Sequence, residues 1–136
     1  MTKQTHKYLT DNGIRPSIQR IAIMDYLLTR RNHPTADEVY CGLLSEIPTL
    51  SKTTVYNTMK LFVHHGVALQ LDVDEKNARF DGIVDAHAHF YCKKCGCIHD
   101  LPLERNFLPS TMDFVIDEAH VTFKGLCANC KQRIAN

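Results

Sequence analysis

The chain has 136 residues, 44% of them hydrophobic, with a net charge of +1 and six cysteines. This length suits one domain or two small ones that support each other. The absence of any run of about 18 apolar residues excludes a membrane span. The N-terminal sequence lacks the apolar segment of a secretory signal, so we expect a cytoplasmic protein.

Charge is unevenly distributed along the chain. Residues 1–66 carry eight basic and five acidic residues, whereas residues 67–136 carry eight basic and ten acidic residues. The first half is therefore better suited to bind a polyanion.

The first two helices have clear local signals. Residues 3–11 form a short predicted helix, which the run Asp11-Asn12-Gly13 would end. Ser17 can cap a second helix that continues to about Arg30. Apolar residues recur along this second helix at helical spacing, at Ile21, Met24, Leu27 and Leu28.

A third helix is predicted to begin within residues 34–38, because Thr35 and Glu38 have the spacing of a capping box. Cys41 lies within this helix, far in sequence from the other cysteines, and we expect it to be a small core residue. The predicted buried face of the helix consists of Val39, Leu43 and Leu44.

A fourth helix is predicted over residues 52–65, with Ser51 as its N-cap and Gly66 after its end. Two strand-like runs follow it, at 67–73 and 77–80, joined by acidic and basic residues that favour a turn. The inward face of the fourth helix is apolar and consists of Val55, Met59 and Phe62.

This order of helices, followed by a two-stranded hairpin, predicts a winged helix-turn-helix whose fourth helix reads DNA. Asn57 can reach a base edge, and Tyr56 can pack on a thymine methyl group. Arg15 and Arg20 are candidate contacts to the DNA backbone, although each could equally be a solvated surface charge. The alternative is a plain helical bundle with a solvated polar face. The predicted contacts to double-stranded DNA are Arg15, Arg20, Ser51, Lys52, Thr53, Thr54, Tyr56, Asn57 and Lys60.

Two C-x-x-C pairs lie in the second half, Cys92 with Cys95 and Cys127 with Cys130, with 31 residues between them. Four thiolates are enough for a closed tetrahedral zinc site, so the pairs predict structural zinc. Cys97 is a possible substitute for Cys95 as a ligand. Disulfides or free core cysteines are the alternatives, and the lack of a secretory signal argues against disulfides.

His87 and His89 lie two positions apart, with Asp81 and Asp100 on either side of them. In an extended strand the two imidazoles share a face and form a chelating pair. Nitrogen and carboxylate ligands suit iron or manganese better than the soft thiolates do. A metallohydrolase with catalytic zinc is the rival interpretation. The chain is too short for a (β/α)₈ barrel and has no accompanying nucleophile or base motif, so we do not expect an enzyme.

Several motifs follow one another along the chain: Gly13-Ile14-Arg15-Pro16-Ser17-Ile18-Gln19-Arg20, His33-Pro34-Thr35-Ala36-Asp37, Ser51-x-x-Thr54-Val55-Tyr56, Arg79-Phe80-Asp81, and His87-x-His89 with the two C-x-x-C pairs. In this series the chain resembles the ferric uptake regulator (Fur) family. The resemblance implies an α+β protein, with an N-terminal winged helix-turn-helix over residues 1–81. It also implies a C-terminal α/β dimerisation domain with structural zinc over 82–136, and a hinge near 81–85. Such a protein would be a homodimer that binds operator DNA and represses genes when its regulatory metal is bound.

The resemblance also implies a regulatory metal site. Matching the family's motifs position by position gives its ligands as His33, Asp81, His87, His89 and Asp100. A metal that joins ligands from both domains would favour the conformation that binds DNA, because a ligand shifts the population toward the state it binds.

An aspartate at position 100, where other members have glutamate, resembles the peroxide-regulator branch of the family. The resemblance then implies that Fe²⁺ in the regulatory site detects hydrogen peroxide by oxidising His33 or His87. Mn²⁺ would support repression without that oxidation. The alternative within the family is an iron- or zinc-uptake regulator that responds to metal level only.

Overall fold

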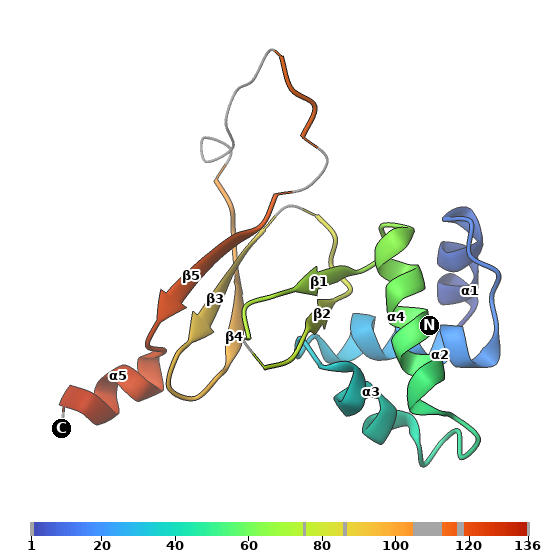
Figure 1. The fold of residues 1–136 in the computed structure, drawn as a ribbon, viewed down its shortest axis with the longest axis horizontal. Helices are drawn as coiled ribbons and strands as arrows, with labels where there is room; N and C mark the ends of the chain where they lie inside the picture. Colours follow the sequence, from blue (N-terminus) through green and yellow to red (C-terminus); the bar gives the residue numbers. More distant parts are fainter. Residues whose placement is uncertain (1, 75, 86, 105–112, 117–118, 136) are drawn as a thin grey trace. The chain divides into compact units, whose positions relative to one another are not determined.

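The computed structural model describes residues 2–74, 76–85, 87–104, 113–116 and 119–135. Two compact units make up the chain, an N-terminal unit (Met1–Val84) and a C-terminal unit (Asp85–Asn136). The boundary expected from the sequence is after residue 81, and the first unit ends at Val84. In the described part of the chain, no helix has the length and apolar character needed to cross a membrane. The helices and strands are α1 (Thr2–Asp11), α2 (Ile18–Arg30), α3 (Ala36–Leu43), α4 (Lys52–His64), β1 (Leu69–Leu71), β2 (Arg79–Asp81), β3 (Ala88–Cys92), β4 (Ile98–Leu101), β5 (Val121–Gly125) and α5 (Ala128–Ala135) (Figure 1).

Three of the four helices in the N-terminal unit begin at the caps that the sequence predicted. Ser17, Thr35 and Ser51 each have extended backbone and accept a hydrogen bond from the amide three residues later. Each of these bonds is 3.1 Å long. A side-chain oxygen at the N-cap satisfies an amide that has no partner within the helix. These local signals therefore fix where α2, α3 and α4 begin.

The core of the N-terminal unit forms around the apolar face of α4. Val55, Met59 and Phe62 are at most 1% exposed, as their helical spacing predicted. Two expectations for α3 are wrong, because Cys41 is exposed and Leu44 is 36% exposed. Cys41 is two residues from the buried Val39 and so lies on the opposite side of the helix, and Leu44 lies beyond the last residue of α3.

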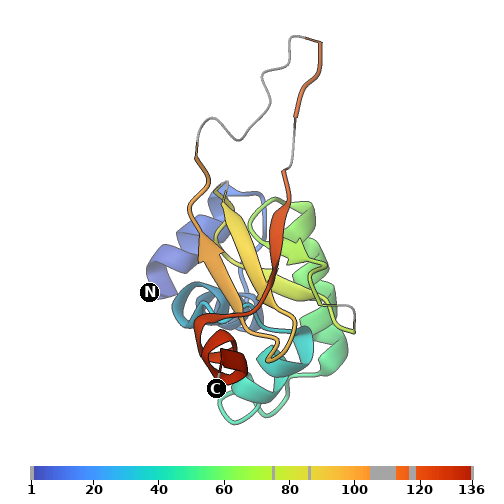
Figure 2. The ribbon, with the colours of Figure 1, turned by 90° about the vertical axis from the view of Figure 1, so that its left-hand side faces the viewer.

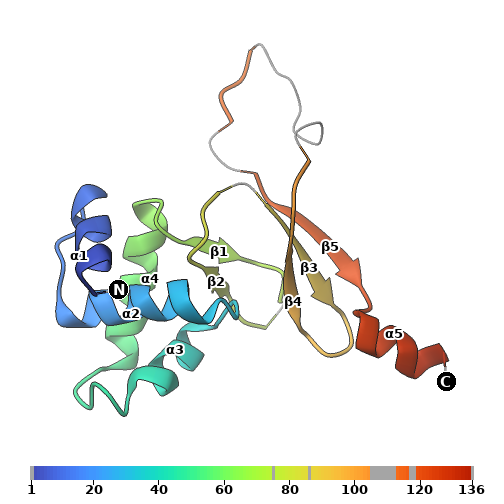
Figure 3. The same cartoon turned by 180° about the vertical axis from the view of Figure 1, so that it is seen from behind.

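A two-stranded antiparallel hairpin, β1 with β2, completes the N-terminal unit, which Figures 1 and 3 show from opposite sides. Leu69 pairs with Asp81, and Leu71 pairs with Arg79. The first strand is shorter than predicted, because the Val67 amide donates to the Phe62 carbonyl (3.0 Å) and belongs to the end of α4. Helices with a short hairpin are the winged helix-turn-helix arrangement that the sequence predicted.

The C-terminal unit contains a three-stranded sheet with the strand order β4-β3-β5 (Figure 2). β3 pairs with β4 as an antiparallel hairpin and with β5 in parallel. α5 follows β5 after a short connection. Together the two units form the α+β class predicted from the sequence.

Candidate metal centres and nucleic-acid interface

In the N-terminal unit, His33 and Asp81 form a buried pair in which each residue is 5% exposed. His33 Nε2 lies 3.5 Å from Asp81 Oδ2. The Phe80 amide donates to the Pro34 carbonyl (2.9 Å) and holds β2 beside the histidine, while the Ile83 amide donates to Asp81 Oδ1 (2.8 Å). His33 has a φ of 49°, in the left-handed region that non-glycine residues seldom occupy. Such backbone strain is concentrated at functional sites.

The C-terminal unit places two histidines on one carboxylate. His89 on β3 is paired in register with Asp100 on β4. The Nε2 atoms of His87 and His89 each lie 3.3 Å from Asp100 Oδ1, and the two ring centroids are 4.4 Å apart. His87 Nδ1 lies 2.6 Å from the Asp85 carbonyl, which can only accept, so Nδ1 carries the proton. The Nε2 atom of His87 therefore faces Asp100.

This arrangement has the donor chemistry of a cation site. Without a proton or a metal between them, the Nε2 atom of His87 and the Asp100 carboxylate would present lone pairs to each other. A divalent ion removes that repulsion and accepts both groups as ligands. The bond from Nδ1 of His87 to a carbonyl is the outer contact that commonly orients a metal-binding histidine. Imidazole nitrogen and carboxylate oxygen together suit iron, manganese or zinc.

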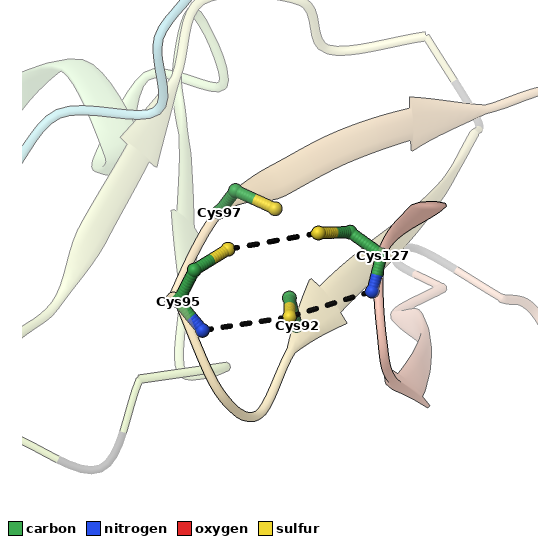
Figure 4. Close-up of side chains that lie close together, drawn as sticks. All are labelled: Cys92, Cys95, Cys97 and Cys127. Carbon is green, nitrogen blue, oxygen red and sulfur yellow. Dashed lines mark hydrogen bonds between the residues drawn. The ribbon is translucent and has the colours of Figure 1, made fainter. Parts of the chain in front are cut away.

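Thiols gather at the other end of the β3–β4 hairpin, where the Sγ atoms of Cys92, Cys95, Cys97 and Cys127 all lie within 4.8 Å of one another (Figure 4). Cys95 Sγ lies 3.8 Å from Cys127 Sγ. For a Zn–S bond of about 2.3 Å, a regular tetrahedron places its sulfurs about 3.8 Å apart. The Gly96 backbone has a φ of 77°, which favours glycine in this turn. The cluster therefore has the donors and the spacing that zinc requires.

Backbone amides prepare one of these thiols to be a thiolate. The amides of Cys95 (3.5 Å) and Cys127 (3.4 Å) both donate to Cys92 Sγ. These two bonds lower the pKa of Cys92 to about 5. A thiolate is the form that binds metal, so Cys92 is ready to bind zinc near neutral pH.

Cys130, in the first turn of α5, is a fifth thiol of the same cluster. Its hydrogen bond with the Cys127 thiol, burial, and contacts with the Cys92 and Cys95 thiols raise the pKa of Cys130 to about 12. Burial, followed by contacts with the Cys95 and Cys127 thiols, raises the pKa of Cys97 to about 12. Cys92, Cys95, Cys97 and Cys127 therefore form the compact thiol group, and Cys130 lines one cavity with Cys95, Cys97 and Cys127.

Two residues that were not predicted as site residues lie beside the candidate sites. His99 is exposed, and its Nε2 atom lies 3.5 Å from Cys97 Sγ. Cys97 and His99 are two positions apart, just before and within β4, and such residues share a face in an extended chain. This spacing could have predicted the contact. Gln19 lines a groove with Arg20 and Asn57. Its place beside Arg20 in the first turn of α2 could have indicated this from the sequence.

The predicted DNA contacts all lie in the N-terminal unit, around the start of α2 and along α4. Ser17, Arg20, Thr54 and Asn57 line one open groove between these helices. The Arg20 guanidinium donates to the Arg15 carbonyl (2.8 Å), which holds its charge at the edge of the groove. The exposed members of the predicted set are Arg15, Ser51, Lys52, Thr53, Tyr56, Asn57 and Lys60.

Comparison with known proteins agrees with these features. The sequence model of the ferric uptake regulator family matches residues 11–106. The peroxide-responsive repressor PerR of Staphylococcus epidermidis is 34% identical over 125 residues, covering 88% of this chain and 83% of the relative. The peroxide operon regulator of Bacillus subtilis is 30% identical, covering 96% and 94%. The structure of the ferric uptake regulator from Pseudomonas aeruginosa with manganese superposes with a TM-score of 0.72 at 20% identity, covering 91% of this chain and 98% of that one.

The family match, together with the ligand clusters, identifies a metal-responsive transcriptional regulator. The chain belongs to the ferric uptake regulator family.

Proposed function

We propose that this protein is a repressor that binds operator DNA as a cytoplasmic homodimer when Fe²⁺ or Mn²⁺ occupies its regulatory site. We further propose that hydrogen peroxide ends repression by iron-catalysed oxidation of its histidine ligands. The observation that carries the proposal is the convergence of His87 and His89 on Asp100, each at 3.3 Å. The names of the Staphylococcus and Bacillus relatives, both peroxide regulators, favour the peroxide signal over a metal-level signal.

The regulatory ion takes its ligands from both units in this proposal. The buried pair of His33 and Asp81 would supply two, and the His87, His89 and Asp100 cluster would supply three. One ion shared between the units would bind only where the two sets come together. Metal binding therefore shifts the population toward that conformation. The size of the shift depends on how much more tightly the metal binds this conformation than the other.

Structural zinc occupies the thiol cluster in this proposal, with Cys92, Cys95, Cys127 and Cys130 as its ligands. The spacing of 3.8 Å between Cys95 and Cys127, and the cavity that Cys130 lines with both of them, support this assignment. Zinc would fasten α5 to the turn between β3 and β4, because the ligands come from both elements. In a unit this small, such a cross-link contributes directly to folding free energy.

DNA binding uses the exposed face of α4 in this proposal. Lys52 and Lys60 would meet phosphates, while Asn57 and Tyr56 would meet bases. The C-terminal unit supplies apolar surface for a second copy of the chain. Its exposed apolar side chains include Phe114, Val115 (90% exposed), Phe123 and Leu126.

Fe²⁺ supplies the ability to reduce peroxide, which Mn²⁺ lacks under the same conditions. One peroxide molecule would then add one oxygen atom to His33 or His87 and leave as water, because these imidazoles would be ligands of the iron. An oxidised imidazole is a poorer ligand, and the metal-bound conformation loses stability. Thiolates held in a closed zinc site have no open position for peroxide and should react more slowly.

The test measures DNA binding and oxidation together in the iron and manganese forms of the full-length protein. Peroxide should release DNA from the iron form, and peptide mass spectrometry should find 16 Da added to His33 or His87, about the mass of one oxygen atom. The manganese form should keep its DNA and show no such addition. Equal release from both forms, with intact histidines and oxidised cysteines, would establish a thiol switch. Insensitivity to peroxide together with release by chelators would establish an uptake regulator.

A further inference from the structure

The thiol cluster holds five cysteines, one more than a tetrahedral zinc site can bind. Cys92, Cys95 and Cys127 are common to two possible sets of four. Cys130 completes one set, since it lines the same cavity as Cys95 and Cys127. Cys97 completes the other, since its Sγ atom and the three shared Sγ atoms all lie within 4.8 Å of one another. Zinc therefore has two candidates for its fourth thiolate.

The two candidates reach the cluster from different elements. Cys97 lies immediately before β4, and its carbonyl accepts from the Cys92 amide (3.0 Å), so its backbone is tied to a shared ligand. Cys130 belongs to the first turn of α5. One of these thiols can consequently leave the cluster without displacing the other.

The surroundings of Cys97 fit a thiol held in reserve. Figure 4 shows its sulfur directed toward the same space as those of Cys95 and Cys127. His99 Nε2 lies 3.5 Å from Cys97 Sγ, so the thiol has a polar neighbour outside the four C-x-x-C cysteines. An open cavity of about 370 Å³, lined by Cys97, His99, Cys130 and Arg133 among others, gives the side chains room to exchange.

We propose that Cys97 is a reserve zinc ligand, which replaces Cys130 when that thiolate is lost. This inference rests on the proposed zinc site. In the exchange, one Zn–S bond to Cys130 breaks and one to Cys97 forms, and the Cys97 proton passes to solvent. The zinc keeps four thiolates and the same net charge. Oxidation of Cys130 by one peroxide molecule, which yields a sulfenic acid and water, would then leave the zinc in place. Damage to one thiol would not release zinc, so histidine oxidation remains the response to peroxide.

Zinc content of full-length variants tests the proposal. Cys127→Ser removes a shared ligand and should lose zinc, while Cys41→Ser, in the exposed part of α3, should keep it. Cys130→Ser should keep zinc after dialysis against a weak chelator, and so should Cys97→Ser. The double variant, which lacks both candidates for the fourth position, should lose zinc at least about tenfold faster than either single variant.

Substitution of Co²⁺ for zinc gives a second measurement, because the thiolate-to-cobalt absorption grows with the number of bound thiolates. Wild type and Cys130→Ser should show the same intensity per cobalt, and the double variant should show about three quarters of it or bind no cobalt. Three-thiolate intensity in Cys130→Ser, or zinc loss equal to that of Cys127→Ser, would overturn the reserve role. Zinc retained by Cys127→Ser, or no zinc in wild type, would instead overturn the zinc site itself.

Discussion

Substitutions of Ser51 can separate the capping of α4 from its contact with DNA. The Ser51 hydroxyl accepts from the Thr54 amide (3.1 Å) and lies 2.8 Å from the Thr54 hydroxyl. Ser51→Ala removes the cap, which costs about 1 kcal/mol of the free energy of unfolding. For a domain of this size, that loss lowers Tm by about 4–8 °C.

Two other substitutions keep the cap. Asparagine and aspartate are as good as serine at this position, so Ser51→Asn and Ser51→Asp should unfold close to the wild-type temperature. The aspartate adds a negative charge, which the helix dipole stabilises by about 0.3–1 kcal/mol. The same charge would repel a DNA phosphate. At a separation of about 5 Å in water the repulsion is about 0.8 kcal/mol, or roughly a fourfold loss of affinity.

Thermal unfolding and fluorescence anisotropy with operator DNA measure the two effects, using the manganese form at low salt to limit screening. We expect the alanine variant to be the least stable and the aspartate variant to bind DNA the most weakly. Ser45→Asp adds the same charge in the exposed turn after α3 and serves as the control. Wild-type affinity in Ser51→Asp would refute the idea that the start of α4 meets phosphate, and wild-type Tm in Ser51→Ala would refute the stabilising role of the cap.

Three further predictions concern the other sites. Cys127→Ser should lose zinc and the dimer together, as measured by metal analysis and light scattering, and a zinc-replete dimer would contradict the thiol site. Lys60→Ala should weaken binding to all DNA sequences and reduce the slope of log K against log salt by about 0.9. Asn57→Ala should instead relax sequence specificity, and unchanged affinity in both variants would mean that another surface meets DNA. Asp100→Glu should keep iron-dependent DNA binding but blunt release by peroxide, because the longer side chain alters the geometry around the metal. Equal release in wild type and Asp100→Glu would show that this carboxylate does not set peroxide sensitivity.

Local sequence signals predicted the helices of the N-terminal unit well. A cap needs only an oxygen three residues before an amide, so Ser17, Thr35 and Ser51 could be identified without knowledge of the fold. Helical spacing likewise located the buried face of α4 at Met59 and Phe62. Each of these features depends on residues within about two turns of one another.

Features that depend on distant partners could not be predicted in the same way. Cys41 was expected in the core because cysteine is often buried, yet its side chain is exposed on α3. The left-handed backbone of His33 has no signal in the sequence, and neither does the hydrogen bond that joins the next residue, Pro34, to Phe80 of β2. Cys97 was considered only as a substitute for Cys95, since spacing alone cannot show that a fifth thiol points into the cluster.

The pairing of His89 with Asp100 has its origin in the thiol turn. The Cys92 amide donates to the Cys97 carbonyl (3.0 Å) and closes the turn between β3 and β4, and the ladder continues from Tyr91 and Ile98 to His89 and Asp100. A shift of this register by one residue would move every side chain of β4 to the other face of the sheet. Asp100 would then leave both imidazoles. The segment that supplies three of the five thiols therefore also sets the geometry of the histidine–aspartate cluster, so a zinc ion that rigidifies this turn would stabilise both sites.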